Sequence, residues 1–318
     1  MPNLIRKKLI ETWKKIGAAD AARIAEQTPT PGVTVERGIP YLADGHPMHT
    51  LNVYYPEGAA GLLPTVVDIH GGGWMYGDRE LNRHFCMFLA AQGYAVVGMS
   101  YRLLPETDLR GQVQDIFASL HWLEGHAAEH HCGLTGVFLT GDSAGGHLSG
   151  LAASVSLSGE LRKVYGVSPL SFPFRAVAIN HGACNVNELG FIKGFMGTLV
   201  EREMKSMLFG KRPKSSPQYR RASLTDTAVG ITLPPLMLIS SEPDGLHERQ
   251  TLKLHAWLKE RGIPHETLFW TRERGERLTH VFNITHPEYE EAVETNLMML
   301  AFFEKSMKRE GAVRDEQI

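Results

Sequence analysis

The sequence predicts an α/β protein with a mainly parallel central sheet, and two observations lead to this prediction. Apolar runs rich in β-formers alternate along the chain with segments of helical periodicity. Such alternation implies parallel strands connected by helices that cover both faces of the sheet. The chain has 318 residues and is 43% hydrophobic, which is enough for a large core. We expect a single domain over residues 1–318.

Apolar side chains at helical spacing open the chain, ahead of the first strand. They are Ile5, Leu9, Trp13 and Ile16. A helix-friendly stretch over residues 18–25 follows, and Pro29 and Pro31 end it. We therefore expect one or two amphipathic helices here. Residues 33–55 then contain two short strand-like stretches separated by Asp44-Gly45, which is typical of a β-hairpin.

The later strands are predicted from apolar runs. These runs cover residues 65–70, 94–100, 136–140, 176–180, 235–240 and 266–270. Helical segments cover residues 81–92, 112–126, 146–156, 248–261 and 289–308. The repeated order of strand and helix indicates parallel strand pairs with helical crossovers.

One interval, residues 184–226, contains no strand pattern. Its bulky apolar residues lie at roughly helical spacing: Phe191, Phe195, Leu199, Met204, Met207 and Leu208. We expect a helical insertion that covers the top of the sheet together with the N-terminal helices. The cations that follow are Lys211, Arg212, Lys214, Arg220 and Arg221. They fit a solvated surface, with attraction of an anionic substrate as the alternative.

Charge and composition narrow the possible partners. The chain carries 33 Lys+Arg against 35 Asp+Glu, a formal net charge of -2. No global positive field therefore attracts nucleic acid or an anionic membrane surface, and a small, neutral or weakly polar molecule is the expected partner. No apolar run approaches the ~20 residues that a membrane span needs. The charged N-terminal stretch does not resemble a signal peptide, so we expect a cytoplasmic protein.

The cysteines give no sign of a metal or redox centre. Cys86, Cys132 and Cys184 are widely spaced, and none belongs to a C-x-x-C pair. Buried, reduced thiols are the expected state. A second group resembles metal ligands by composition: His126, His130, His131 and Cys132. These residues lack a compact ligand pattern, so no metal is expected there.

The sharpest chemical motif is the pentapeptide GDSAG around Ser143. It directly follows the predicted strand at 136–140 and precedes a predicted helix. A tight turn between a strand and a helix projects a nucleophilic serine, and small flanking residues relieve crowding. The helix N-terminus offers amide groups to developing negative charge. An ordinary glycine-rich turn is the alternative, which the flanking strand and helix disfavour.

A second motif, HGGGW at residues 70–74, follows the predicted strand at 65–70. Acyl transfer develops an oxyanion, and backbone N–H groups reach it only where side chains do not block the approach. Glycines at the carboxyl end of a strand provide that access. A phosphate-binding loop is the alternative, but the phosphate-loop patterns are not found in this sequence.

A nucleophilic serine needs a base, and the base needs an acid that orients it. In the strand-turn-helix context of Ser143 the chain order is serine, acid, histidine. Asp244 follows the strand at 235–240, and His280 lies in a loop before the last helix, so the order is satisfied. Glu242 is the alternative acid. The competing bases are His265 and His286, which are expected at the surface.

Taken together, HGGGW, GDSAGG, PDGL and HVF resemble the bacterial hormone-sensitive-lipase-like esterases, over most of the chain from residue 33 to residue 308. The resemblance implies an α/β-hydrolase fold and an oxyanion hole built from Gly71, Gly72 and Ala144. It also favours Asp244 as the acid and implies a helical cap formed by residues 1–32 and 184–226. In addition, it gives structural roles to His70 and to the stretch YRLLPE at 101–106.

The resulting hypothesis is a serine carboxylic-ester hydrolase with the triad Ser143, Asp244 and His280. We expect short to medium acyl esters as substrates, because Phe191, Phe195, Met196, Met204 and Met207 would close an apolar pocket over the acyl group. No cofactor or metal is required, and a homodimer is possible by analogy with the family. The alternatives are an amidase or formamidase on the same fold, and a non-catalytic relative that only binds ligands.

Overall fold

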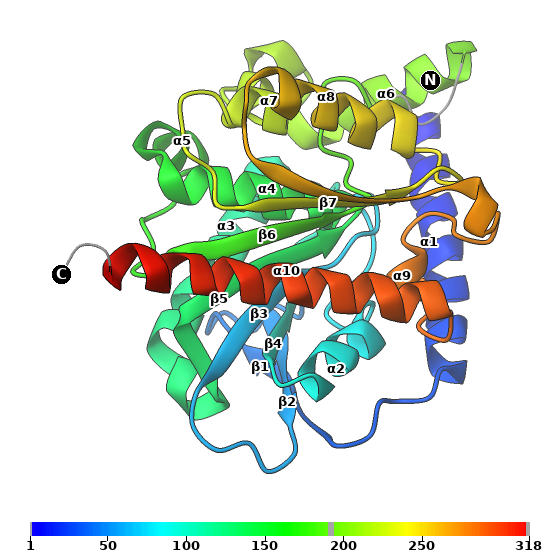
Figure 1. Cartoon of the computed structure of the whole chain (residues 1–318). Coiled ribbons are helices and arrows are strands. Elements are labelled where there is room, and N and C mark those ends of the chain that lie inside the picture. The colour runs from blue at the N-terminus through cyan, green and yellow to red at the C-terminus, as the bar shows by residue number, and fades with distance from the viewer. Residues whose placement is uncertain (1, 190–193, 316–318) are drawn as a thin grey trace.

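The computed structural model describes residues 2–189 and 194–315 and contains one eight-stranded sheet (Figure 1). The strand order is β1-β2-β4-β3-β5-β6-β7-β8. Strand β1 (Val33–Pro40) pairs antiparallel with β2 (Thr50–Pro56), which confirms the predicted hairpin. Strand β2 also pairs antiparallel with β4 (Ala95–Met99). The connection between β1 and β2 covers residues 41–49 and is longer than a tight two-residue turn.

The rest of the sheet is parallel. Beside β4 lie β3 (Leu63–Ile69), β5 (Cys132–Asp142), β6 (Phe174–Asn180), β7 (Leu236–Ser241) and β8 (His265–Trp270). Every pairing among these strands is parallel. The prediction of a mainly parallel sheet is therefore confirmed, and all of these strands end at the same edge.

Helices cover both faces of the sheet, as predicted. One face packs against α2 (Arg83–Ala91) and α10 (Glu290–Asp315), which crosses the front of Figure 1. The other face packs against α3 (Leu109–His126), α4 (Ala144–Leu157) and α8 (Leu252–Glu260). The chain also forms α5 (Gly159–Tyr165), which the sequence reading did not anticipate.

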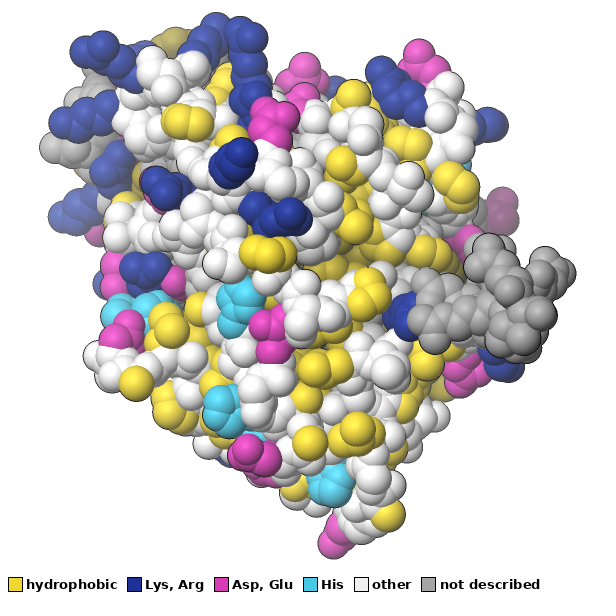
Figure 2. All heavy atoms as spheres, turned by 90° about the vertical axis from the view of Figure 1, so that its left-hand side faces the viewer, with side chains coloured by type: hydrophobic (Ala, Val, Ile, Leu, Met, Phe, Trp, Pro, Cys, Tyr) yellow, Lys and Arg dark blue, Asp and Glu magenta, His cyan; other side chains and the backbone are white. Residues whose placement is uncertain are grey.

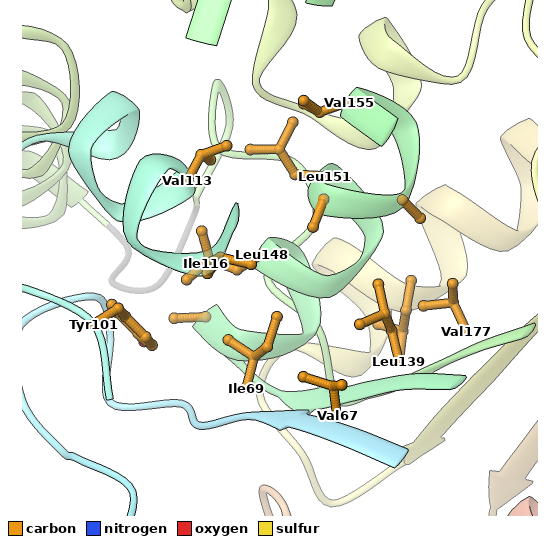
Figure 3. Close-up of a cluster of buried hydrophobic side chains, with 14 of the residues drawn as sticks. Val67, Ile69, Tyr101, Val113, Ile116, Leu139, Leu148, Leu151, Val155 and Val177 are labelled. Carbon is orange, nitrogen blue, oxygen red and sulfur yellow. The ribbon is translucent and has the colours of Figure 1, made fainter. Parts of the chain in front are cut away.

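The core follows from the two-residue period of the strands. In β5, Val137 and Leu139 pack toward α3 and α4, whereas Phe138 between them packs toward α10. Figure 3 shows this packing on the α3 and α4 side, where Leu148 lies beside Ile116 and Leu151 beside Val113, above the strand residues. Each fully buried side chain of this kind contributes about 1.5–3 kcal/mol. The apolar runs of the sequence are thus strands with two buried faces.

The N-terminal segment is one helix, α1 (Pro2–Glu26), rather than two. It contacts α6 (Gly194–Phe209), and the Arg6 guanidinium lies 2.6 Å from the Glu203 carboxylate. Beyond α6 the insertion contains the short helical turns Pro213–Ser215 and Tyr219–Arg221 and the helix α7 (Leu224–Thr227). The predicted helical character of this interval is confirmed for the described residues.

The apolar residues of α6 divide in a way that was not predicted. Met204 and Met207 are buried, but Phe195 is 77% exposed and Met196 is 55% exposed. The expectation that Phe195 and Met196 close over a pocket is therefore wrong, because both side chains face solvent in this structure. Phe191 lies outside the described residues.

Charge is distributed unevenly despite the small net charge. Residues 1–32 and 184–226 together carry twice as many Lys and Arg as Asp and Glu. Figure 2 shows Lys and Arg side chains gathered in the upper left of the face it draws, whereas the rest of that face mixes side chains of all types.

The three cysteines are reduced and buried, as expected. Within the described ranges, no helix is long and apolar enough to cross a membrane.

Candidate active site

The candidate residues gather at the carboxyl-terminal edge of the parallel strands. His70 and Gly71 follow β3, Ser143 follows β5, and Asp244 follows β7 shortly after its last residue. Open α/β sheets bind their ligands at this edge. Residues that are far apart in the sequence are therefore brought together by strand direction alone.

Ser143 sits in a strained turn between β5 and α4. Its backbone angles are φ 53° and ψ -115°, a conformation that residues other than glycine rarely adopt. The flanking glycines are required by crowding. A Cβ at Gly145 would lie 1.8 Å from the Ile69 carbonyl oxygen, and a Cβ at Gly141 would lie 2.6 Å from the Gly145 carbonyl group. This is the geometry of a nucleophile elbow.

The expected oxyanion donors differ in their availability. The Gly71 N–H donates to Asp142 Oδ1 at 2.9 Å, so its assignment as an oxyanion donor is corrected. In the described part of the chain, the amides of Gly72 and Ala144 have no acceptor, and the same holds for the neighbouring Gly73. Gly72 and Gly73 have positive φ values of 95° and 59°, which favour glycine. The loop therefore presents free amides one residue later than expected.

His70 supports this loop and does not face a reacting group. Its Nδ1 lies 2.9 Å from the Gly71 carbonyl oxygen, and its ring stacks on Tyr101 at a centroid distance of 4.4 Å. Burial lowers the pKa of His70 to about 4, so the imidazole is neutral at neutral pH. The Tyr101 hydroxyl donates to the His70 carbonyl oxygen at 2.8 Å. A neutral, buried His70 can shape the loop but does not act as the base.

Asp244 lies beside His280. The distance from Asp244 Oδ1 to His280 Nδ1 is 3.0 Å, and the Leu246 N–H donates to the same oxygen at 2.9 Å. The imidazole and carboxylate are not ideally aligned for a hydrogen bond, because His280 Nδ1 lacks a well-oriented partner; such bonds often tighten only when substrate binds. The Asp244 side chain is 2% exposed and that of His280 is 39% exposed. The acid is thus buried and the base is open to solvent.

The pKa of Asp244 is lowered below its ordinary value. Burial alone raises it, but the hydrogen bond from His181 and the close contact with His280 outweigh burial. Asp244 is therefore a carboxylate under all ordinary conditions, as an orienting acid must be.

The competing residues have other partners. Glu242 Oε2 accepts a hydrogen bond from the Arg272 N–H at 2.9 Å. His265 Nε2 lies 2.8 Å from His255, and His286 Nδ1 lies 3.0 Å from Glu288. The structure thus brings Asp244 and His280 together and gives each of the alternatives a partner elsewhere.

A second histidine at this site was missed by the sequence reading. His181 directly follows β6, and its Nδ1 lies 2.8 Å from Asp244 Oδ2. Its side chain is fully buried. The available signal was position: His181 follows a predicted strand, as Ser143 and Asp244 do. Among 15 histidines, that position alone did not distinguish it.

Beneath the nucleophile lies a buried pair of carboxyl groups. Asn82 Nδ2 donates both to Asp142 Oδ1, at 2.8 Å, and to Asp68 Oδ2, at 3.0 Å. Burial raises the pKa of Asp142, although the Asn82 hydrogen bond lowers it in part. Burial and the nearby charge of Asp142 raise the pKa of Asp68 well above its usual range. Two close, buried carboxyls do not both ionise easily, so at least one holds its proton more tightly than usual.

Three side chains at this site are also of the types that can bind a metal ion. Among the residues that the structure describes, His181, Asp244 and His280 form the one group of potential ligands. Their separations of 2.8 and 3.0 Å are hydrogen-bond distances. The imidazole of His130, from the other group considered, lies with its Nδ1 2.7 Å from a Glu36 carboxylate oxygen.

The N-terminal helix reaches the glycine loop. A Cβ at Gly73 would lie 2.3 Å from the Trp13 ring, and Trp13 stacks on Tyr76 at a centroid distance of 5.2 Å. Tyr76 also lies close to Gly72, because a Cβ there would be 2.1 Å from the Tyr76 carbonyl oxygen. Helix α1 therefore forms part of the wall around the free amides.

Solved structures resemble this chain closely. Esterase B from Lactobacillus rhamnosis (HN001) matches with a TM-score of 0.93 and 38% sequence identity, over 99% of this chain and 98% of that chain. A structure described as a tributyrin phosphonate complex of the same esterase matches with a TM-score of 0.92 and 38% identity, over 98% of both chains.

Sequence comparison gives a shorter match among curated proteins. Carboxylesterase NlhH of Mycobacterium tuberculosis is 32% identical over 180 residues, which are 53% of this chain and 54% of NlhH. The match thus spans about half the length of this relative. Residues 51–258 match the BD-FAE family. The chain therefore belongs to the BD-FAE family, within the α/β-hydrolase esterases that resemble hormone-sensitive lipase.

Proposed function

We propose that this protein hydrolyses carboxylic esters through an acyl-serine intermediate. The observation that carries the proposal is the pairing of Asp244 with His280 at 3.0 Å, on the strand edge where Ser143 occupies its strained turn. The nucleophile, the base and the acid then have the roles of a serine-hydrolase triad. Membership of an esterase family supports the same chemistry.

In the proposed mechanism His280 accepts the proton of Ser143 as the serine oxygen attacks the ester carbonyl carbon. The free amides of Gly72, Gly73 and Ala144 would stabilise the oxyanion. The alcohol leaves with the proton from His280, and an acyl-serine remains. Water then attacks the acyl-serine, with His280 as base, and the carboxylic acid is released. Asp244 fixes the tautomer of His280 throughout and stabilises its charged form.

The proposed substrates are esters with short to medium acyl chains. The support comes from the neighbouring structure of esterase B, whose inhibitor is a phosphonate related to tributyrin. Each added methylene group contributes about 0.8 kcal/mol only while it finds dry space. The rate should therefore climb over a few carbons and fall when the pocket ends.

We further propose that α1 and residues 184–226 form a cap over the site. The contact between α1 and α6, together with the approach of Trp13 to Gly73, supports this arrangement. Because Phe195 and Met196 are exposed, the apolar lining over the acyl group must come from other side chains. A cytoplasmic location and a homodimer stay predictions.

The central experiment compares Ser143→Ala with Ser156→Ala on p-nitrophenyl butyrate. Ser156 lies on the same helix, α4, and its hydroxyl donates only to the Ala153 carbonyl oxygen. We expect the first variant to lose most turnover, by roughly 10⁵-fold or more, and the second to keep it. A folded Ser143→Ala protein with near-normal turnover would refute the proposal.

The substrate range needs a second experiment. A panel of p-nitrophenyl esters from acetyl to palmitoyl, with a matched anilide at the best chain length, measures acyl preference and ester selectivity together. We expect a maximum of kcat/KM among the short chains and slower cleavage of the anilide. Rates that rise continuously to palmitoyl would indicate a lipase, and faster anilide cleavage would indicate an amidase.

A further inference from the structure

The orienting acid of the proposed triad is held from both sides by histidines. Asp244 Oδ1 faces His280 Nδ1 at 3.0 Å, and Asp244 Oδ2 faces His181 Nδ1 at 2.8 Å. The two imidazole rings are nearly perpendicular, with an interplanar angle of 88° and centroids 5.7 Å apart. His280 is open to solvent while His181 is not, so the two rings cannot exchange roles.

The protonation state of His181 follows from its surroundings. Burial lowers its pKa more than the Asp244 hydrogen bond raises it. The charged or titratable groups that face the ring are Asp244, His280 and His247, and the Phe282 ring packs against it edge-on. His181 is therefore a neutral imidazole at neutral pH, and its contact with a carboxylate requires the proton on Nδ1.

The second ring nitrogen of His181, Nε2, does not contribute to the stability of the fold. His181 Nε2 is buried and has no hydrogen-bond partner among the described residues. A buried polar atom without a partner destabilises a fold. The residue also has a positive φ of 50°, a backbone conformation that is uncommon for residues other than glycine. Both features count against a role in stability alone, whereas the contact with Asp244 uses the ring productively.

We propose that His181 is a positioning residue, which fixes the Asp244 carboxylate so that its other oxygen faces His280 during ester hydrolysis. The inference rests on the proposed function. With Oδ2 bonded to His181 and Oδ1 accepting from the Leu246 N–H, the carboxylate is held against rotation about its last bond. Because His181 is neutral, it orients Asp244 without cancelling the negative charge that stabilises the His280 imidazolium.

The test compares variants that keep or remove the Nδ1 donor. In His181→Asn the amide nitrogen can take the place of Nδ1, and asparagine tolerates positive φ. In His181→Gly the donor is lost, and glycine accepts the backbone angle without strain. His247→Asn is the matched control, because the His247 ring is buried nearby and contacts the Ser240 hydroxyl, whereas only its backbone N–H, which the substitution keeps, donates to the Asp244 carbonyl oxygen.

We expect His181→Gly to lose about 10- to 100-fold in kcat with little change in KM. Losses of this size are typical when a residue that orients an active-site group through a hydrogen bond is removed. The acidic limb of its kcat/KM profile should move to higher pH, since an Asp244 without its second donor holds the His280 proton more tightly. His181→Asn and His247→Asn should stay within about threefold of the wild type. Equal losses in His181→Asn and His181→Gly with an unchanged pH profile would overturn the proposal.

A measurement on the unmodified enzyme covers the case in which the variants do not fold. Nitrogen NMR of histidine-labelled protein reports the tautomer of each ring. We expect His181 to be neutral with its proton on Nδ1, and finding that proton on Nε2 would overturn the proposal. Labelling of Ser143 by a fluorophosphonate tests the proposed ester hydrolysis separately from the positioning role of His181. If wild-type protein is neither labelled nor active on esters, the proposed function fails while the tautomer result still stands.

Discussion

Asp142 and Asp244 are both buried aspartates at the carboxyl-terminal edge of the sheet, but their pKa values move in opposite directions. Burial raises the pKa of Asp142. Burial acts in the same direction on Asp244, where two histidines overcome it and the pKa falls. The difference comes from the contacts: Asp142 accepts hydrogen bonds from the neutral Asn82 amide and Gly71 N–H, with the charge of His280 as a further influence, whereas Asp244 lies 2.8 and 3.0 Å from two imidazoles.

The two environments suit two different tasks. Asp142 accepts from the Gly71 N–H and from Asn82, so it fixes the backbone of the glycine loop next to the nucleophile. Asp244 accepts a hydrogen bond from His181 and lies 3.0 Å from His280, and both side chains can carry a proton. In the proposed function, the same residue type is thus structural at one strand end and takes part in catalysis at the other, and the identity of its donors decides which.

Replacement of Asp244 by Asn should have the largest effect in this comparison. An amide at this position favours the wrong histidine tautomer, and the serine-protease precedent gives a loss of about 10⁴ in kcat. Steady-state hydrolysis of p-nitrophenyl butyrate measures this loss in kcat. Glu242→Gln is the control and should change kcat little, because Glu242 contacts Arg272 instead. A larger loss in the Glu242 variant would move the acid to Glu242.

The same substitution at Asp142 should cost much less, within about 10-fold in kcat. In Asp142→Asn the amide oxygen of the new side chain could still accept from Gly71 and Asn82, and no proton transfer depends on this position. Asp142→Ala would remove the oxygen that accepts both hydrogen bonds and leave the Gly71 N–H and one Asn82 N–H unpaired, at about 1–3 kcal/mol for each. Kinetics and urea unfolding of both variants measure these effects. If Asp142→Asn were as inactive as Asp244→Asn, the distinction between the two aspartates would fail.

The smallest expected effect is a change in the pH dependence of stability when Asp68 is replaced. Its pKa is raised in the folded protein, so its contribution to stability is complete below the unfolded value of about 3.9 and is lost as pH rises through the folded value. Asp68→Asn does not titrate. The difference in melting temperature between Asp68→Asn and the wild type should therefore shift in favour of the variant from about pH 4 to about pH 8. A constant difference over that interval would show that Asp68 carries no raised pKa.

Much of the architecture could be predicted because the relevant signals are local. The apolar runs of the strands, the hairpin at 33–55 and the helix before Pro29 are read directly from side-chain period and turn residues. The turn at Ser143 was also predictable, because the GDSAG motif directly follows a strand pattern and precedes a helical segment. Such constraints involve few residues that are near one another in the chain.

Other features depend on contacts between distant segments. The family resemblance implied Gly71 as an oxyanion donor, but the Gly71 N–H donates to Asp142, which lies 71 residues away. Phe195 and Met196 have the right composition for a pocket lining and are exposed instead. Hydrophobicity predicts that a side chain prefers burial, but it does not determine which surface is available for packing.

The sequence by itself determined the sheet and its flanking helices, because the strands and helices have different side-chain periods. It also predicted that Ser143, Asp244 and His280 lie at one edge, because parallel strands all end there. Only the tertiary structure decided which donors each carboxylate receives. His181 illustrates the reason: its 2.8 Å contact with Asp244 joins residues 63 positions apart. A hydrogen bond depends on distances of a few tenths of an ångström between atoms of different strands, and no local pattern in the chain encodes such a distance.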